Sequence, residues 1–264
     1  RSPEVIIKEA KELINSGVKE ITLLEQNVNA YNGLNEKNKS IDFTSLIKIL
    51  CKLDDLKRLR FVTSHPRDMT ENLINLFGQE EKLMPYLHLP IQSGSNQILK
   101  KMNRGHTVEY YLDIISKLKV IRPEIAISGD FIVGFPGETE EDFQKTLEIC
   151  EIIKYSQAYS FKYSPRTGTP SFEMKDISEK VKSYRLSKLQ ETISIYQREF
   201  QKNLVGTVQD VLIEKLGKLS DQYIGRTPYM NPVVIKSKDN QIGKILPVKI
   251  CETNGLSLSG EHVI

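Results

Sequence analysis

The feature that most constrains the fold of this chain is an alternation of strand and helix patterns through its first two thirds. Short apolar runs typical of buried strands are each followed by a segment with helical periodicity. These runs lie at residues 18–24, 59–63, 86–90, 125–133 and 158–163. Repeated strand–helix units joined by short turns predict parallel strands connected by right-handed crossovers. We therefore expect a parallel βα sheet or barrel in this part of the chain.

Capping residues mark the ends of the intervening helices. Ser2-Pro3-Glu4 is a helix start and Gly17 a helix stop, while Thr139 and Asp142 have the spacing of a capping box. The other helices are expected at residues 42–52, 68–77, 96–102, 108–121 and 177–203. Each predicted strand is thus followed by a helix that can cover the sheet.

The pattern changes to short strands after residue 203. Turn residues separate apolar runs at 207–213, 222–225, 233–235, 244–250 and 256–260. Such a series predicts a small closed or nearly closed β-barrel. We therefore expect two domains, residues 1–202 with the long helix at its end and residues 203–264.

Glycine, amide and hydroxyl groups follow all five predicted parallel strands. The carboxyl ends of parallel strands meet at one edge, where such folds bind their ligands. The residues at these strand ends include Gln26, Asn27, Asn29, Ser64, Gln92, Ser93, Ser95, Gly134, Gly137, Glu138 and Arg166. They predict a ligand-binding rim, although turn formation and helix capping would use many of the same residue types.

Several classes of function lack the residues they need. The sequence has no phosphate loop, no nucleophile elbow and no zinc-protease motif. Cys51, Cys150 and Cys251 lie about a hundred residues apart, a spacing typical of reduced structural thiols and not of metal ligands. No window approaches the roughly 20 apolar residues of a membrane span. If the chain is an enzyme, a cofactor must supply the reactive chemistry.

Six strings of residues, taken together and in order, resemble the MiaB family of tRNA methylthiotransferases. They are Leu23–Tyr31, Thr63–Pro66, His88–Ser95, Met102–Arg104, Asp130–Thr139 and Tyr163–Pro170. The resemblance spans nearly the whole chain. It implies an incomplete parallel βα barrel of the radical S-adenosylmethionine type, with the first strand missing, followed by a small all-β TRAM barrel that binds RNA.

The resemblance also implies an activity. Enzymes of this family add a methylthio group to carbon 2 of N6-isopentenyladenosine next to the anticodon of tRNA. They use S-adenosyl-L-methionine and two [4Fe–4S] clusters. By this resemblance we expect tRNA as the partner, a monomer, no membrane association and a cytoplasmic location.

The resemblance assigns parts of the rim to parts of S-adenosylmethionine. The adenine side would be met by Gly134, Gly137 and Glu138. The ribose and methionine would be met by Gln92, Ser93 and Ser95. The methionyl amino and carboxylate groups would be met by Gln26, Asn27 and Asn29. The remaining candidates are Ser64, Asp130, Tyr163 and Arg166, of which the last two would lie at the mouth of the barrel.

Two departures from the family pattern matter. Glu25 stands where the family has glycine, and the family's cluster-binding cysteines are expected upstream of Arg1. We therefore expect a fragment that ligates neither cluster and is inactive alone. A non-catalytic tRNA-binding module with the barrel as scaffold is the alternative. Residues 203–264 carry 7 basic and 6 acidic side chains, a weak electrostatic match to RNA. A phosphate-binding βα-barrel enzyme of other chemistry is a third possibility, but the strand ends lack an acid–base pair.

Overall fold

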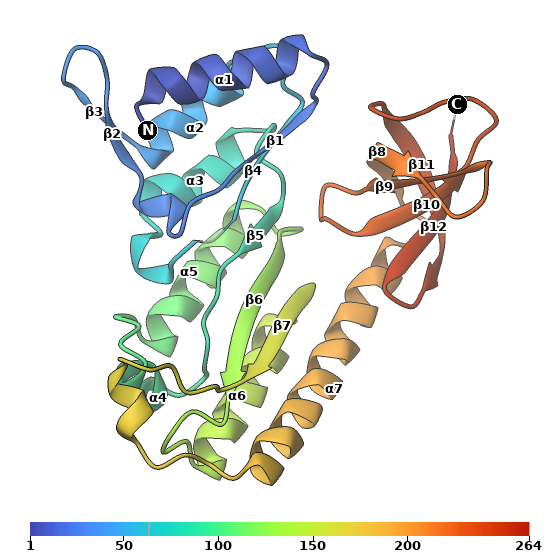
Figure 1. The fold of residues 1–264 in the computed structure, drawn as a ribbon. Helices are drawn as coiled ribbons and strands as arrows, with labels where there is room; N and C mark the ends of the chain where they lie inside the picture. Colours follow the sequence, from blue (N-terminus) through green and yellow to red (C-terminus); the bar gives the residue numbers. More distant parts are fainter. Residues whose placement is uncertain (63, 264) are drawn as a thin grey trace.

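Five parallel strands with helices packed against one face form the N-terminal part of the chain, as Figure 1 shows. The computed structural model describes residues 1–62 and 64–263. Thr63 belongs to the predicted second strand and Ile264 to the predicted C-terminal domain, and both lie outside the described residues. The parallel strands are β1 (Glu20–Leu23), β4 (Arg58–Phe61), β5 (Tyr86–His88), β6 (Ala126–Val133) and β7 (Gln157–Lys162). β1 pairs with β4, β5 with β6 and β6 with β7, and a bridge from Leu59 to Leu83 connects the two groups.

The helices follow the strands as the sequence predicts. They are α1 (Pro3–Asn15), α2 (Phe43–Cys51), α3 (Glu71–Gln79), α4 (Asn96–Lys101), α5 (Val108–Ile121) and α6 (Glu140–Ile153). The capping box is present: Thr139 Oγ1 accepts from the Asp142 amide at 3.2 Å, and Asp142 Oδ2 accepts from the Thr139 amide at 2.9 Å. Helix α3 begins later than predicted because Thr70, and not Asp68, caps it through the Leu73 amide.

A β-hairpin between β1 and α2 was not predicted. Its strands are β2 (Asn32–Leu34) and β3 (Ser40–Asp42). The Asn35 side chain accepts from the amides of Lys37 and Lys39, and Asn38 has a φ of 56°. Three-residue strands carry too little alternation to be seen in the sequence, so only this turn chemistry could have indicated the hairpin. Short 3₁₀ helices occupy Val28–Ala30, Pro66–Asp68 and Pro170–Glu173.

The parallel sheet has one apolar face and one polar face. Leu59, Leu87, Ile127 and Phe131 belong to the main core cluster, together with side chains of the covering helices. Residues at alternate positions point to the opposite face because side chains alternate along a strand. These include Glu20, Arg58, Arg60, Tyr86, His88, Ser128 and Asp130. The face turned away from the helices is therefore polar, unlike that of a sheet buried on both sides.

Helix α7 (Glu179–Leu204) connects the two parts of the chain. Its 26 residues span roughly 39 Å, and it packs along α6 and β7. Lys182 and Arg185 near its start bond to the loops after β7 and β6, and Phe200 near its end makes an edge-to-face contact with Tyr229 of the C-terminal barrel. The helix thus runs from the carboxyl ends of the parallel strands to the barrel (Figure 1).

The last five strands form a closed barrel, as the sequence predicts. They are β8 (Val208–Leu216), β9 (Gln222–Arg226), β10 (Pro232–Lys236), β11 (Ile245–Asn254) and β12 (Ser257–His262), in the order β10-β12-β11-β8-β9. Register shifts between Ile213 and Lys215 and between Ile250 and Glu252 help the short strands to bend. A second, separate core of Val, Ile and Leu side chains fills this barrel.

No helix in residues 1–62 or 64–263 has both the length and the apolar character that crossing a bilayer requires.

Candidate functional site

Hydrogen bonds join the loops that follow β1 and β4. Asn29 Nδ2 donates to the His65 carbonyl at 2.9 Å, and Asn29 Oδ1 accepts from the His65 amide, also at 2.9 Å. Asn27 Nδ2 donates to Asp68 Oδ2 at 2.6 Å. The predicted amides of the first loop therefore position the second loop, and Gln26 remains exposed beside them. Glu25, the departure from the family pattern, is exposed and accepts from the Gln26 amide.

The neutral imidazole of His65 stabilises the second loop. Its Nδ1 accepts from the Arg67 amide at 3.1 Å, and its ring lies 5.5 Å from that of His106. Burial, together with the nearby Arg104 and His106, lowers the pKa of His65 to about 4. The imidazole is therefore a hydrogen-bond acceptor within the loop and not a proton donor near neutral pH.

The loop after β5 satisfies most of its own polar groups. Gln92 has a φ of 78°, and its backbone bonds to Asp130 and Ile132 of β6. Ser93 Oγ accepts from the Ser95 amide at 3.2 Å. Ser95 caps α4 and donates to Asp142 Oδ1 at 2.5 Å. The two buried serines therefore shape this loop, and the Gln92 side chain makes no hydrogen bond within the described residues.

The loop after β6 is fastened to α7. Glu138 Oε2 accepts from the Gly134 amide at 2.7 Å and from Arg185 Nη1 at 2.8 Å. Burial raises the pKa of Glu138 above its usual value, although both of these contacts lower it. A Cβ on Gly134 would lie 2.5 Å from Lys182 Cγ, so the glycine makes room for α7. Gly137 has a φ of 78°, a conformation that favours glycine, and its carbonyl accepts from Lys101 at 3.3 Å.

Tyr163 and Arg166 follow β7 at the same edge. The Tyr163 ring lies 4.9 Å from the ring of Phe135, and the Lys182 ammonium lies 5.6 Å from the Tyr163 centroid. Arg166 is exposed, and its carbonyl accepts from Thr169 within the loop. The rim therefore contains an ordered aromatic residue beside an exposed guanidinium.

Four buried polar atoms at this edge are left without a partner in the described part of the chain. They are Asn27 Oδ1, Ser64 Oγ, Glu138 Oε1 and Tyr163 Oη. Buried polar atoms are nearly always hydrogen-bonded in folded proteins. Here the four come from the loops after β1, β4, β6 and β7, so the unused capacity is spread around one edge. The edge is therefore suited to a polar ligand with several donors and acceptors, such as S-adenosylmethionine.

His88 contacts two polar side chains of the neighbouring strand β6. Its Nδ1 lies 3.0 Å from Ser128 Oγ, and its Nε2 lies 3.5 Å from Asp130 Oδ2. All three belong to the polar face of the sheet, and His88 is in register with Ser128. Polar residues at alternate positions of two apolar strands were the signal that could have indicated this cluster. The candidate Asp130 thus lies on the sheet face and not in a loop.

The cysteines do not fit an iron–sulfur cluster. Cys51 and Cys150 are buried, and burial raises the pKa of each thiol to about 12, whereas Cys251 is exposed in the C-terminal barrel. A cluster requires close thiolates. Within residues 1–62 and 64–263 no group of three or more His, Cys, Asp or Glu could hold a metal ion.

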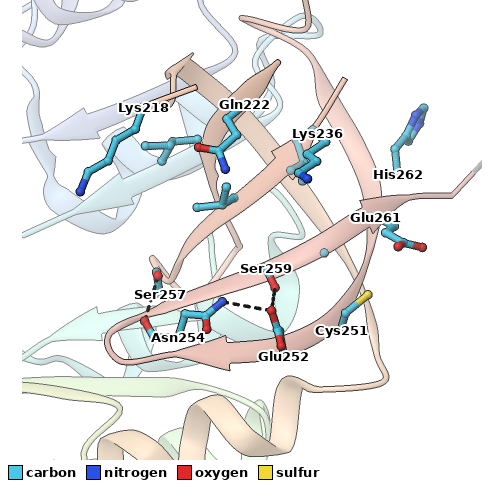
Figure 2. Close-up of a pocket in the computed structure, with 14 residues that line it drawn as sticks. Lys218, Gln222, Lys236, Cys251, Glu252, Asn254, Ser257, Ser259, Glu261 and His262 are labelled. Atoms are coloured by element: carbon cyan, nitrogen blue, oxygen red, sulfur yellow. Dashed lines mark hydrogen bonds between the residues drawn. The ribbon is translucent and has the colours of Figure 1, made fainter. Parts of the chain in front are cut away.

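A hollow of about 750 Å³ lies on the surface of the C-terminal barrel (Figure 2). On its floor Glu252 accepts from Ser259 at 3.1 Å and from Asn254 at 3.3 Å. Lys218 and Lys236 contribute positive charge, and Glu252 and Glu261 contribute an equal negative charge. This surface therefore has hydrogen-bonding groups but no net attraction for a polyanion.

Comparison with known proteins agrees with this geometry. The radical SAM superfamily model matches residues 1–150, and the TRAM domain model matches residues 202–263. The chain is 51% identical to the tRNA-2-methylthio-N(6)-dimethylallyladenosine synthase of Rickettsia felis, over 100% of this chain and 60% of the relative. The same identity holds to the synthase of that name from Rickettsia rickettsii (strain Sheila Smith), over 99% of this chain and 59% of the relative.

Among solved structures, Streptococcus suis SuiB bound to S-adenosylmethionine is similar at 14% identity and a TM-score of 0.49, over 75% of this chain and 42% of that chain. This chain spans about 60% of the length of the curated relatives it matches. The radical SAM model covers more than half of the chain, which assigns the chain to that superfamily. The chain belongs to the radical SAM superfamily, and its C-terminal part is a TRAM domain.

Proposed function

We propose that this chain is the C-terminal part of a tRNA methylthiotransferase that adds a methylthio group to carbon 2 of N6-isopentenyladenosine next to the anticodon. The observation that carries the proposal is the 51% identity along the whole chain to synthases named for this reaction. The two domain matches, in the order radical SAM then TRAM, support it. The cofactor is S-adenosyl-L-methionine, which when bound supplies the radical and the methyl group of this chemistry.

The residues of this chain bind and position the cofactor. Ser64 Oγ, Tyr163 Oη and Asn27 Oδ1 are buried acceptors, and the two hydroxyls can also donate. They would meet the polar groups of S-adenosylmethionine at the carboxyl edge of the sheet. Asn29, Ser93, Ser95 and Glu138 would hold the loops in place, since their side chains already bond within the protein. The direct contacts of Gln26, Gln92, Gly134, Gly137, Asp130 and Arg166 with the cofactor stay predictions.

The iron–sulfur chemistry belongs to the rest of the protein in this proposal. Because the thiols of this chain do not fit a cluster, the two [4Fe–4S] clusters would be ligated by the part of the protein that the relatives have and this chain does not span. The proposal also divides the domains between residues 202 and 203 and takes tRNA as the partner. It further includes a monomeric state and a cytoplasmic location.

A chimeric protein tests the function directly. The part of the Rickettsia felis synthase that this chain does not match is fused to residues 1–264 and produced in bacteria that lack their own methylthiotransferase. Mass spectrometry of tRNA nucleosides should then detect the 2-methylthio product. The chain produced alone should give none. A folded chimera that binds S-adenosylmethionine but leaves the nucleoside unmodified would contradict the proposal.

The misfit of the cysteines favours one second function, a tRNA-binding module in which the parallel barrel serves only as scaffold. The same experiment separates the two. An inactive chimera combined with tight tRNA binding by the chain alone would support the module. Product formation by the chimera would exclude it.

A further inference from the structure

The TRAM barrel docks at the amino ends of the parallel strands, opposite the candidate cofactor edge. Arg58 and Arg60 of β4 bond to it, and the arrows of β6 and β7 in Figure 1 point away from it. Between the domains lies a groove lined by segments around the starts of β1, β4 and β5 and, on the barrel side, by β8, the start of β11 and two turns. The two domains therefore meet at the end of the sheet that the cofactor residues do not occupy.

Two buried arginines hold the domains together. The side chains of Arg58 and Arg60 are 3% and 2% exposed, and both pair with Glu20, whose carboxylate lies 2.9 Å from Arg60 Nε and 3.5 Å from Arg58 Nη1. Arg60 Nη1 donates to the Pro228 carbonyl at 2.8 Å, and Arg58 Nη1 donates to the Arg226 carbonyl at 3.2 Å. Glu20, Arg58 and Arg60 are called the latch below.

The latch binds the backbone of the TRAM barrel and not its side chains. Arg60 Nη2 also donates to the Thr227 carbonyl at 3.2 Å, and Arg58 Nη2 donates to the Asp210 carbonyl. A planar guanidinium with several donors fixes orientation as well as distance. The latch therefore sets the position of one domain relative to the other.

A groove of about 740 Å³ lies beside the latch, with walls from both domains. Lys19, Lys57 and Lys82 line the radical SAM side, and Lys244 lines the TRAM side. The acidic side chains in the lining are Glu81 and Asp210, so lysines outnumber acids by 4 to 2. None of these four lysines forms an ion pair within the described residues.

The charge of this interdomain groove distinguishes it from the hollow in Figure 2. That hollow has two lysines and two glutamates, so its charges balance apart from His262. An RNA backbone is recognised by unpaired cations that replace its counterions. The lining of the interdomain groove has two more lysines than acidic side chains, whereas the two lysines of the hollow in Figure 2 are matched by two glutamates.

We propose that the interdomain groove binds the sugar–phosphate backbone of RNA, and that the site exists only while the latch holds the two domains together. The proposal rests on the proposed function, in that it takes tRNA to be the polyanion. Lys57 and Lys244 are its most exposed basic groups, one from each domain.

The position of the groove predicts which part of the RNA it contacts. The groove is lined by residues before β1, β4 and β5, and the candidate cofactor edge follows the same strands, so the two lie at opposite ends of the sheet. An RNA with its target base at the cofactor edge reaches the groove only through a stem. Stem recognition through phosphates does not depend on sequence.

Fluorescence anisotropy with the whole 264-residue chain and a labelled RNA hairpin tests the groove. Lys57→Gln and Lys244→Gln should each weaken binding about 3- to 10-fold and lower the slope of log K against log salt by about 0.9. The double variant should show the product of the two losses. Exchanging base pairs in the hairpin stem should leave the affinity unchanged.

The matched control is the hollow of Figure 2. Lys218→Gln and Lys236→Gln remove the same charge, both from the TRAM domain, and should change affinity less than 2-fold. Equal losses in both pairs of variants would show that only total charge matters and would overturn the proposal. So would displacement of the hairpin by polyglutamate of equal charge, which would mark the groove as a surface for acidic proteins.

The latch is tested separately. Arg60→Met should weaken hairpin binding to the level of the lysine double variant, although Arg60 is buried and cannot meet the RNA. Circular dichroism verifies that the variant is folded. If it is not, Glu20→Gln, which keeps both arginines, replaces it. Unchanged RNA binding with a released TRAM domain, detected by small-angle scattering, would show that the groove is not a composite site.

The outcomes distinguish this proposal from the proposed function. If the chimera forms the methylthio product while the lysine variants bind RNA normally, only the groove is wrong. If the lysine variants lose RNA binding while the chimera forms no product, only the enzymatic function is wrong.

Discussion

Arg185 of α7 lies with Nη1 2.8 Å from the carboxylate of Glu138 in the loop after β6, and their side chains are 5% and 0% exposed. The pair joins the start of the connecting helix to the predicted cofactor loop. Because Glu138 also accepts from the Gly134 amide, this one carboxylate sets the shape of the loop and the place of α7.

Removing one partner of this pair should be costly. Arg185→Met leaves the carboxylate buried without its cation, and we expect the free energy of unfolding to fall by about 3–5 kcal/mol. The double variant Arg185→Met with Glu138→Gln should recover part of that loss. Urea unfolding measures both. As a control, Lys188→Met breaks the exposed pair with Glu191 and should cost under about 1 kcal/mol.

Asn29 should be required for the shape of the loops after β1 and β4. Its amide donates to the His65 carbonyl and accepts from the His65 amide. Asn29→Ala therefore leaves the His65 amide without a partner, while the His65 carbonyl keeps its hydrogen bond from the Asp68 amide. We expect a loss of about 1–3 kcal/mol. Asn29→Asp keeps the size but not the donor and should be destabilised as well. Hydrogen exchange of the His65 amide would reveal the opening, and unchanged protection in Asn29→Ala would contradict the role.

The unpartnered hydroxyls should affect ligand binding more than stability. Ser64→Ala and Tyr163→Phe each remove a buried hydroxyl that makes no hydrogen bond within the described residues. Unfolding free energies should therefore stay within about 0.5 kcal/mol or rise. Affinity for S-adenosylmethionine, measured by isothermal titration calorimetry, should fall roughly 5- to 10-fold. A large loss of stability without loss of affinity would show that these groups serve the fold.

Stability should fall below pH 6.5 through His65. The pKa of its imidazole is about 4 in the folded chain, below the value of roughly 6.5 expected when unfolded. The unfolded chain binds the proton first as the pH falls, so the stabilising effect is complete above pH 6.5 and is lost between pH 6.5 and 4.

The variant His65→Asn isolates this contribution. Asparagine can also accept from an amide two residues on but does not titrate in this range. The unfolding free energies of the variant and of the unchanged chain are measured with urea at several pH values. Between pH 6.5 and 4, that of the variant should fall by about 1–3 kcal/mol less. Parallel pH profiles of the two proteins would show that folding does not lower the pKa of His65.

The three thiols should differ in reactivity. Burial raises the pKa of Cys51 and Cys150 to about 12, whereas Cys251 is exposed. Because the thiolate is the reactive form, a disulfide reagent at pH 8 should modify one thiol quickly and the other two only after denaturation. Cys251→Ser should abolish the fast phase. A fast phase in that variant would mean that the core around Cys51 or Cys150 opens readily.

Local patterns made most of the architecture predictable. Ser2, Thr139 and Asp142 cap the helices that their spacing indicates, because a capping bond joins residues only three positions apart. The apolar strand runs and the turn-separated strands after residue 203 predicted a parallel sheet followed by a small barrel for the same reason. The hairpin of β2 and β3 escaped notice because its strands are too short to show a pattern.

The roles of the rim residues were less predictable. Ser95 and Glu138 follow strands at the predicted edge, yet their side chains bond to Asp142 and Arg185, which lie 47 residues further along the chain. His88 shares a face with Asp130 only because β5 and β6 pair in this register. Contacts across such separations depend on packing, which residue type and spacing do not encode.

By itself the sequence determined the order of elements, the edge at which polar residues gather and the resemblance that led to the family, since all of these follow from residue types at short or fixed spacing. Only the tertiary structure decided which polar atoms are already paired and which remain unpartnered. It also decided that Arg58 and Arg60, at the start of the predicted strand at 59–63, are buried against carbonyls about 150 to 170 positions away. The physical reason is that backbone carbonyls of any residue accept hydrogen bonds, so no side-chain pattern reveals where a guanidinium will find them.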